Sequence, residues 1–408
     1  MNTIEIARVR VVQGIGGFWV NDQPAIQMGA QPDGFFFKGA PVSPGFRSIR
    51  EPSVAYCIVI ELTDGQMAFG DCVTVLNAGY AGRPRPILAE NLGIVQEALS
   101  NAYEGKRFSG FREAAALLDE LDLDSDVARP VAFGVSQALL SAAALANRSL
   151  MASVLTKEYD LPGHYVAPGL AASCGGNWEL NVEKAIVRGV DMFPQAAIQT
   201  RAQCEQLPDY ASWIAKRLGE LGAPGYQPDL HFDFHSALGR MFDNDEDRVC
   251  DYLSDIVERV GSLQVYFEDP FLSRSASEAQ DRMARLRLRL DTRGPNCRLI
   301  ADEWVNSPGE AKNFAAAQAA HAFQIKTPDN GSLINTISAI QTCHEHGILS
   351  YVGGSCNETE ISVKASVHVG IALNAWRMFT RPGLGFDEGL MVVTNERNRT
   401  MALLPGNS

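Results

Sequence analysis

The sequence predicts an α/β protein, in which a (β/α)8-type, TIM-like barrel follows an N-terminal α+β capping domain. Two observations predict this arrangement. A chain of 408 residues is too long for one simple core, so two domains are expected. The order of the predicted elements also changes at about Tyr165, from strands followed by helices to a repeated order of strand, loop and helix. We therefore place a capping domain with a lid loop at residues 1–160 and a catalytic barrel at residues 161–408.

The capping domain is predicted from its strands and helices. The runs IEIARVRVV and SVAYCIVIELTDGQMAFGDC are rich in β-branched residues, and the second turns at Thr63-Asp64-Gly65. Helical segments follow at about residues 86–121 and 131–155. Residues 14–49 between the two strands are rich in glycine, proline and aromatic residues, and a loop this long in a compact domain is usually a lid or disordered. The aromatic residues favour the lid.

The barrel is predicted from short apolar runs that alternate with helical stretches such as LPDYASWIAKRLGEL and DRVCDYLSDIVERV. Seven or eight such units in the second part of the chain suit a barrel in size. A doubly wound open sheet is the alternative, but no glycine-rich phosphate fingerprint follows the first strand. The candidate strands are residues 165–172, 195–199, 229–234, 263–268, 298–302, 321–326 and 348–352.

Composition argues against several classes of partner. The net charge of −13 disfavours nucleic acid and anionic membranes as main partners. No run approaches the roughly 20 apolar residues of a membrane helix, and the first residues lack the apolar core of a signal peptide. No two of the eight cysteines form a C-x-x-C pair. Scattered cysteines of this kind favour reduced thiols in a cytoplasmic protein. A small-molecule substrate remains as the expected partner.

Three acidic residues stand at the ends of consecutive predicted strands. Asp233 lies in LHFDF, Glu268 ends LQVYFE, and Asp302 follows RLIA, at spacings of 35 and 34 residues. Consecutive strands of a barrel bring such residues together at its C-terminal mouth. Carboxylates brought this close repel one another, and a hard cation such as Mg2+ relieves the repulsion. The alternative is that each acid caps a helix or pairs with a nearby base.

Lys326 ends the next strand, AFQIK, and an unpaired buried ammonium is costly. A neighbouring dication and partial burial both disfavour the protonated amine, so we expect a lowered pKa for Lys326 and a role as general base. An amine beside a metal-bound carboxylate suits removal of a proton alpha to that carboxylate, and the metal stabilises the resulting enolate. The alternative is an ordinary surface lysine, or one paired with Asp329.

The motifs at these strand ends resemble methylaspartate ammonia-lyase of the enolase superfamily. The resemblance covers nearly the whole chain and includes the N-terminal run GFWVNDQPAIQMGAQPDGF. It implies the enolase-superfamily variant of the barrel and elimination of ammonia from 3-methylaspartate to give mesaconate. It also implies Mg2+-dependent homodimers, often with K+ as activator. The barrel motifs that carry it are HFDF, FEDP, ADEWVN, QIKTPD, GGSCNETE and RPGLGFDEGLMVV.

The resemblance also implies roles for individual residues. Lys326 matches the base that takes the C3 proton of the (2S,3S) substrate. Gln324 matches a glutamine that hydrogen-bonds the metal-bound carboxylate, and Ser355 and Cys356 match a Thr-Cys pair at the other carboxylate. Matches to the Mg2+ ligands are Asp233, Glu268 and Asp302.

Three positions depart from the family pattern. Gln195 stands in place of a catalytic histidine, and glutamine holds a carboxylate but cannot transfer a proton at neutral pH. Ala172 replaces a substrate-contacting glutamine, and Phe379 replaces a smaller leucine. We expect Lys326 alone to support anti elimination, with Gln195 and Gln324 holding the metal-bound carboxylate. Loss of the histidine should remove syn elimination and C3 epimerisation.

These departures leave the substrate and a second acid-base group open. His235, just past Asp233, is the best candidate to replace the missing histidine; the others are His164, His231 and His321. The main hypothesis is a Mg2+-dependent carbon-nitrogen lyase acting on an aspartate-like acid. One alternative is an enolase-superfamily lyase or dehydratase for a different amino or hydroxy acid. The other is a non-catalytic binding protein descended from a lyase.

Overall fold

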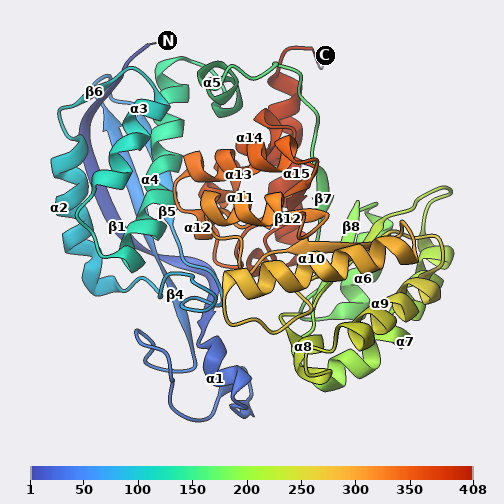
Figure 1. The fold of residues 1–408 in the computed structure, drawn as a ribbon. Helices are drawn as coiled ribbons and strands as arrows, with labels where there is room; N and C mark the ends of the chain where they lie inside the picture. The colour runs from blue at the N-terminus through green and yellow to red at the C-terminus, as the bar shows by residue number, and fades with distance from the viewer. Residues whose placement is uncertain (1, 407–408) are drawn as a thin grey trace.

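The computed structural model describes residues 2–406 and contains an N-terminal sheet with helices on it, followed by a closed barrel (Figure 1). The N-terminal sheet has the order β5-β4-β1-β6. Its strands are β1 (Ile4–Asn21), β4 (Arg50–Leu62), β5 (Met67–Cys72) and β6 (Arg107–Phe108). The predicted turn at residues 63–65 joins β4 to β5 as expected, because glycine at position 65 takes a positive φ of 85°. The domain boundary at residue 160 stays a prediction.

Strand β1 is longer than the sequence predicts. It pairs with β4 beyond residue 12, and its last pairs include Trp19 with Pro52. The expected lid loop therefore begins only after Asn21, and it contains α1 (Gln23–Gln27) and a small hairpin of β2 (Pro32–Asp33) and β3 (Phe36–Phe37). The glycines at 14, 16 and 17 obscured this strand because glycine is depleted in strands.

The predicted helix at 86–121 is divided into shorter elements. A break at Glu104 and Gly105, the latter with φ 71°, ends the first long helix. The second predicted helix begins earlier, where the Asp124 side chain caps the amide of Asp126. These elements are η1 (Ala89–Asn91), α2 (Leu92–Tyr103), α3 (Phe111–Ala116), η2 (Leu117–Glu120), α4 (Ser125–Ala146) and α5 (Met151–Glu158).

The expectation that no run approaches a membrane helix is wrong for helix α4, the one helix among residues 2–406 that is long and apolar enough to cross a membrane by length and composition. However, 78% of its most apolar window is buried inside the protein. It packs on β4 and β5 of the N-terminal sheet, where Val131, Val135 and Leu139 are fully buried. Its apolar character is thus that of a core helix.

The second part of the chain is a closed barrel of eight parallel strands, as predicted. The strands are shorter than the apolar runs suggested, and the eighth was not predicted, because a three-residue strand leaves no periodic pattern. In chain order they are β7 (Gly169–Ala171), β8 (Met192–Ala197), β9 (Asp229–Asp233), β10 (Val265–Glu268), β11 (Cys297–Ala301), β12 (Ala322–Ile325), β13 (Leu349–Val352) and β14 (Arg377–Phe379).

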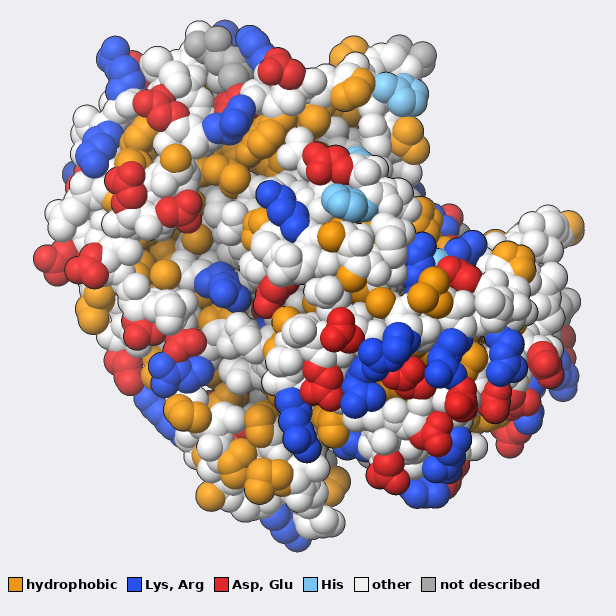
Figure 2. Space-filling model, viewed as in Figure 1, with side chains coloured by type: hydrophobic (Ala, Val, Ile, Leu, Met, Phe, Trp, Pro, Cys, Tyr) orange, Lys and Arg blue, Asp and Glu red, His pale blue; other side chains and the backbone are white. Residues whose placement is uncertain are grey.

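Helices surround the barrel and alternate with its strands (Figure 1). Figure 2 shows basic and acidic side chains interleaved over the face where α9 and α10 lie, and ion pairs such as Arg285–Glu246 and Arg293–Asp251 join these two helices. The helices are α6 (Trp178–Val187), α7 (Arg201–Leu221), α8 (Ala237–Met241), α9 (Glu246–Val260), α10 (Ala276–Arg293), α11 (Pro308–Ala316), α12 (Thr327–Asn330), α13 (Leu333–Glu345), α14 (Glu360–Ala372), η3 (Pro382–Leu384) and α15 (Phe386–Leu403).

His321 gives the barrel a predictable response to pH. Its Nδ1 accepts a hydrogen bond of 2.9 Å from the Leu299 amide, and its Nε2 lies 2.8 Å from Asp291. Burial lowers the pKa of His321 to about 4, although Asp291 opposes the shift. The unfolded state therefore binds more protons between about pH 4 and 6.5, and the free energy of unfolding falls as pH drops through that window, by up to about 3 kcal/mol.

We expect the melting temperature of the wild type to fall more between pH 7 and pH 5 than that of His321→Asn, which keeps an acceptor but does not titrate. Equal falls in the two proteins, measured by calorimetry, would contradict this interpretation.

Candidate active site

A cavity of about 350 Å³ lies at the C-terminal ends of the barrel strands. Residues of the N-terminal region and of the barrel both line it. Strand β1 reaches it because Gly17 lies against the loop after β13: its amide donates to the Asn357 carbonyl at 2.9 Å, and a Cβ there would meet Glu358 O at 2.7 Å. The lining residues from the N-terminal region are Phe18, Val75, Leu76, Asn77 and Arg83. Lining residues from the barrel include Gln195, Asp233, His235, Gln324, Lys326, Ser355, Cys356 and Phe379.

The three predicted acids converge at this mouth. Asp233 and Glu268 are the last residues of paired strands β9 and β10, and Asp302 follows β11. All three are buried, and Asp233 also lines the cavity. Carboxylate oxygens of Glu268, Asp302 and Glu303 lie within 4.8 Å of one another, so this tightest group includes Glu303 where the sequence suggested Asp233.

Asp233, which lies outside this group, contacts one neutral and one basic side chain. Gln195 Nε2 donates to Asp233 Oδ2 at 2.8 Å, and His235 Nε2 lies 3.0 Å from the same oxygen. Asp233 still contributes to the field at Glu268: burial first, and then the charges of Asp233 and Asp302, raise the pKa of Glu268 well above its usual range. The acids are thus close enough to repel one another.

The donor set fits a hard divalent cation. Buried carboxylates outnumber the basic side chains Arg83, Lys326 and His235 that contact them. Oxygen-only donors on neighbouring strand ends are the ligands that Mg2+ prefers. One buried oxygen, Glu303 Oε2, has no hydrogen-bond partner among the residues described. A cation at this group would compensate the excess negative charge that the basic residues leave.

Lys326 lies beside these acids, with its Nζ donating to Asp302 Oδ2 and its side chain 13% exposed. The expectation of a lowered pKa is wrong for these side chains alone. Burial and Arg83 lower the pKa of Lys326, but the carboxylates of Asp302, Glu303 and Asp329 outweigh them and raise it above the ordinary value. The predicted lowering of the Lys326 pKa assumed a bound cation that neutralises those carboxylates.

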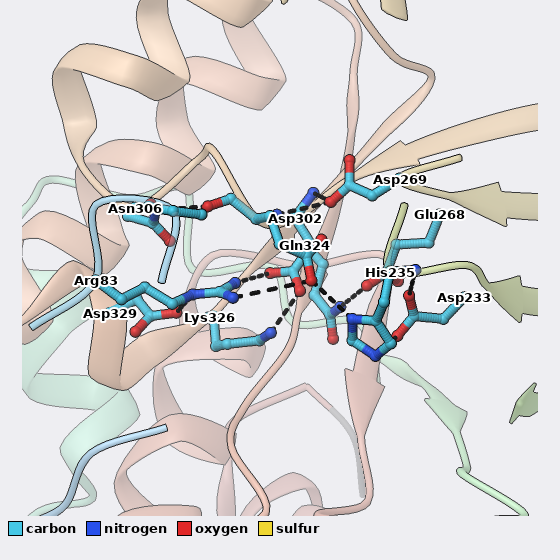
Figure 3. A network of polar contacts seen from close by, with 12 residues as sticks. Arg83, Asp233, His235, Glu268, Asp269, Asp302, Asn306, Gln324, Lys326 and Asp329 are labelled. Atoms are coloured by element: carbon cyan, nitrogen blue, oxygen red, sulfur yellow. Dashed lines mark hydrogen bonds and ion pairs between the residues drawn. The ribbon is translucent and has the colours of Figure 1, made fainter. Parts of the chain in front are cut away.

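Arg83 is the main site residue that sequence reasoning missed. It comes from the loop between β5 and η1, its side chain is 1% exposed, and it reaches between Asp329 and Asp302 (Figure 3). Its Nε donates to Asp329 Oδ2 at 2.7 Å, and its Nη2 lies 3.3 Å from Asp302 Oδ1. Glu303 lies 3.8 Å from Nη1. Only the run GRPRP marked this loop, and it says nothing about burial.

The predicted glutamines and the Ser355 loop also reach the site. Gln324 Nε2 donates to Glu268 Oε1 at 2.6 Å, so this amide, like that of Gln195, holds one of the predicted metal ligands. Ser355 Oγ lies 3.3 Å from the Thr74 carbonyl and accepts from the Asn357 amide at 3.1 Å. Cys356 lines the cavity next to it.

A buried ion pair supports that loop. Arg381 Nε lies 3.0 Å from Glu358 Oε2, and neither side chain is exposed. The same carboxylate oxygen accepts the Ser355 amide at 2.8 Å. Arg381 also donates to the Phe379 carbonyl, so one arginine connects the end of β14 with the loop after β13.

Two family models match almost the whole chain: the N-terminus of methylaspartate ammonia-lyase over residues 4–160 and its C-terminus over residues 165–405. The chain is a member of the methylaspartate ammonia-lyase family. The enzyme of that name from Citrobacter amalonaticus is 36% identical over 98% of this chain and 99% of its own. The enzyme from Clostridium tetanomorphum is 32% identical over 98% of this chain and 99% of its own.

Solved structures agree with this assignment. The Citrobacter amalonaticus methylaspartate ammonia lyase containing (2S,3S)-3-methylaspartic acid has a TM-score of 0.94 at 36% identity, covering 98% of this chain and 99% of that one. The Mg complex of β-methylaspartase from Clostridium tetanomorphum has a TM-score of 0.91 at 32% identity, covering 99% and 100%. Muconate cycloisomerase from Pseudomonas fluorescens, at TM-score 0.65 and 17% identity over 94% and 88%, shares the fold alone.

The three positions expected to depart from the family pattern do not all reach the cavity. Gln195 and Phe379 line it, and the Phe379 ring makes an edge contact with Tyr351. Ala172 is fully buried and is not among the cavity-lining residues; its neighbour Ser173 takes the lining position. A three-residue strand β7 makes a shift of one position easy to misjudge, because neighbouring side chains point to opposite faces.

Of the four candidate histidines, His235 alone lines the cavity. Its Nδ1 lies 2.8 Å from Glu303 Oε1, and its Nε2 contacts Asp233. Burial lowers the pKa of His235, but these two carboxylates outweigh burial and hold it well above the usual range. His231 is buried against Glu268 at 2.7 Å, His321 lies outside the site, and His164 is exposed.

Proposed function

We propose that this protein is a Mg2+-dependent carbon-nitrogen lyase that eliminates ammonia from an aspartate-like amino acid, with 3-methylaspartate as the first substrate to test. The observation that carries the proposal is the group of buried acids on successive strand ends with Lys326 beside it. Whole-chain similarity to enzymes whose structures contain Mg or (2S,3S)-3-methylaspartic acid supports it. Mesaconate would be the product from 3-methylaspartate.

Asp233, Glu268 and Asp302 would hold Mg2+, which supplies positive charge against the negative charge that develops on the substrate carboxylate. Their positions at the mouth suit this role: the strand pairing of β9, β10 and β11 aligns the three strand ends. Glu303 would remain the partner of His235 at 2.8 Å. The donor chemistry and the family match support these metal-binding roles.

Lys326 would act as the base. Its amine takes the proton from C3, the electrons of the C3–H bond form the C2–C3 double bond, and the C2–N bond breaks to release ammonia. Gln195 and Gln324 would orient the substrate carboxylate, because both amides line the cavity and already contact the acids. Ser355 and Cys356 would contact the second carboxylate, and Phe379 would limit the space for the C3 substituent.

The alternative is a lyase or dehydratase for a different amino or hydroxy acid, and Gln195 and Phe379 are the observations that favour it. Glutamine offers no proton transfer on the second face of the substrate. A cavity that hydrogen-bonds different groups selects a different substrate. The two functions share the metal and Lys326 and differ in the leaving group.

We also propose that the enzyme is a cytoplasmic homodimer. The family resemblance supports the dimer, and the eight free cysteines agree with a reducing compartment. Light scattering after size-exclusion chromatography tests the dimer: a mass near one chain of 44.3 kDa would contradict it.

An ultraviolet assay for a new conjugated acid tests the function. We expect Mg2+-dependent turnover of (2S,3S)-3-methylaspartate in the presence of K+, and no turnover of the (2S,3R) isomer because Gln195 cannot act as a second base. Asp302→Asn is the control and should lose the Mg2+-dependent rate. If the folded, Mg2+-binding wild type shows no turnover, the alternative function is favoured. A panel of amino and hydroxy diacids, with ammonia release measured separately, would then identify the substrate.

A further inference from the structure

Arg83 makes a contact that the proposed reaction does not use directly. It belongs to the N-terminal region, yet its guanidinium lies among acids of the barrel: Asp329 at 2.7 Å and Asp302 at 3.3 Å. The Asn306 side chain, which donates to the Ala81 carbonyl at 2.8 Å, holds the same loop from the barrel side. Positive φ values at Ala81 (53°) and Gly82 (75°) give the loop the turn that aims Arg83 inward.

Asp329 is the important partner because of its position relative to Lys326. Lys326 is the N-cap of α12 and Asp329 lies in its single turn, with the Asp329 amide donating to the Lys326 carbonyl at 3.1 Å. Asp329 is 1% exposed, and its Oδ1 has no hydrogen-bond partner within residues 2–406. Arg83 provides the only counter-charge that contacts Asp329 in that part of the chain.

Without Arg83, Asp329 would be a buried carboxylate with no compensating charge, which costs several kcal/mol. Lys326 is the cation best placed to relieve this, because it is three residues from Asp329 and its carbonyl already accepts the Asp329 amide. An amine that pairs with Asp329 would give up its contact with Asp302, and an ammonium held in that pair cannot accept a substrate proton. Lys326 instead donates to Asp302, on the opposite oxygen from Arg83.

We propose that Arg83 is a positioning residue: by pairing with Asp329 it keeps that carboxylate from capturing Lys326, and so leaves the amine directed at the substrate. This inference rests on the proposed function for its kinetic readout alone. It also means that the base is correctly directed only when the loop of residues 77–83 is docked on the barrel.

The kinetic test uses double-mutant cycles. We expect Arg83→Met to lower kcat by about tenfold to a hundredfold with a smaller change in KM, because a misdirected base affects the chemical step. Adding Asp329→Asn should recover kcat by about tenfold, a coupling typical of groups in one ion-pair network. Recovery is expected because the competing carboxylate is gone although the loop still lacks its arginine.

The matched control is Arg83→Met with Glu303→Gln, also measured as a cycle. It removes one buried negative charge near position 83 but leaves Asp329 free to bind Lys326. We expect it to recover thermal stability without recovering kcat. Equal coupling of position 83 to 303 and to 329 would overturn the proposal, because a role in docking or charge balance alone predicts that result. Activity of Arg83→Met within threefold of wild type would also overturn it.

Crystal structures provide a readout that does not depend on turnover. In Arg83→Met with Mg2+ we expect Lys326 Nζ to have moved from Asp302 to within hydrogen-bond distance of Asp329. Nζ still directed at Asp302 or the cavity overturns the proposal, even if the wild type is inactive on 3-methylaspartate and the proposed function fails. Arg83→Gln, which keeps a donor without the charge, carries the same expectation if Arg83→Met does not accumulate as folded protein.

Discussion

Replacing Lys326 by methionine is expected to lower kcat by about a hundredfold or more, the usual contribution of a positioned general base. The change removes the amine that donates to Asp302 while keeping a long side chain in a space that is 13% exposed. Turnover of (2S,3S)-3-methylaspartate, followed by the new ultraviolet absorbance, measures the loss. Mg2+ binding, measured by calorimetry, should survive because Asp233, Glu268 and Asp302 are unchanged.

Lys312→Met is the matched control, since Lys312 is an exposed residue of α11 and contacts no site residue. It should retain wild-type turnover. If Lys326→Met also remains nearly as active as the wild type, Lys326 is not the base, and His235 becomes the next residue to test.

Replacing Arg381 by methionine is expected to destabilise the fold by about 3–5 kcal/mol, the cost of leaving a buried charge without its partner. The carboxylate of Glu358 would be left buried without a counter-charge, because its side chain has no exposed surface and its main ionic partner is Arg381. Denaturant unfolding measures the loss. Because Ser355 donates its amide to the same carboxylate, we also expect weaker substrate binding in the folded fraction.

Two comparisons separate this effect from a general loss of packing. Arg381→Met combined with Glu358→Gln removes both charges and should recover part of the stability. Arg201→Met breaks an exposed pair with Glu205 and should change stability little. A double variant no more stable than Arg381→Met alone would show that volume, not charge, explains the loss.

The fold could largely be predicted from local pattern. Strands β9 to β13 are short, largely buried segments, as parallel strands covered on both faces are, although polar residues such as His231 and Gln324 interrupt their apolar runs. The acids at the ends of β9 and β10 and after β11 indicated the edge at which these strands meet. Strand β14, with three residues, and the late part of β1, with three glycines, lack such a pattern. Their strand state depends on tertiary pairing, with β7 and β13 in one case and with β4 in the other.

The candidate site could be predicted where it follows from strand ends and not where it follows from loops. Lys326 and the three acids stand at fixed places along their strands, so their convergence follows from the barrel. Arg83 lies more than two hundred residues from Asp302 in the chain, and only the docking of its loop brings them together. Ala172 was expected to reach the substrate, but Ser173 lines the cavity instead. At the end of a short strand, a shift of one residue decides which side chain points into the cavity.

The cavity has walls from both parts of the chain, with Phe18, Asn77 and Arg83 on one side and the barrel mouth on the other. Thermodynamic linkage follows from this shared enclosure. A molecule that fills the cavity binds only the docked arrangement, so its binding free energy adds to the free energy that joins the two parts. We therefore expect saturating substrate to make the N-terminal sheet and the barrel melt as one cooperative unit, and the resistance of the loop at residues 77–83 to proteolysis to rise with occupancy.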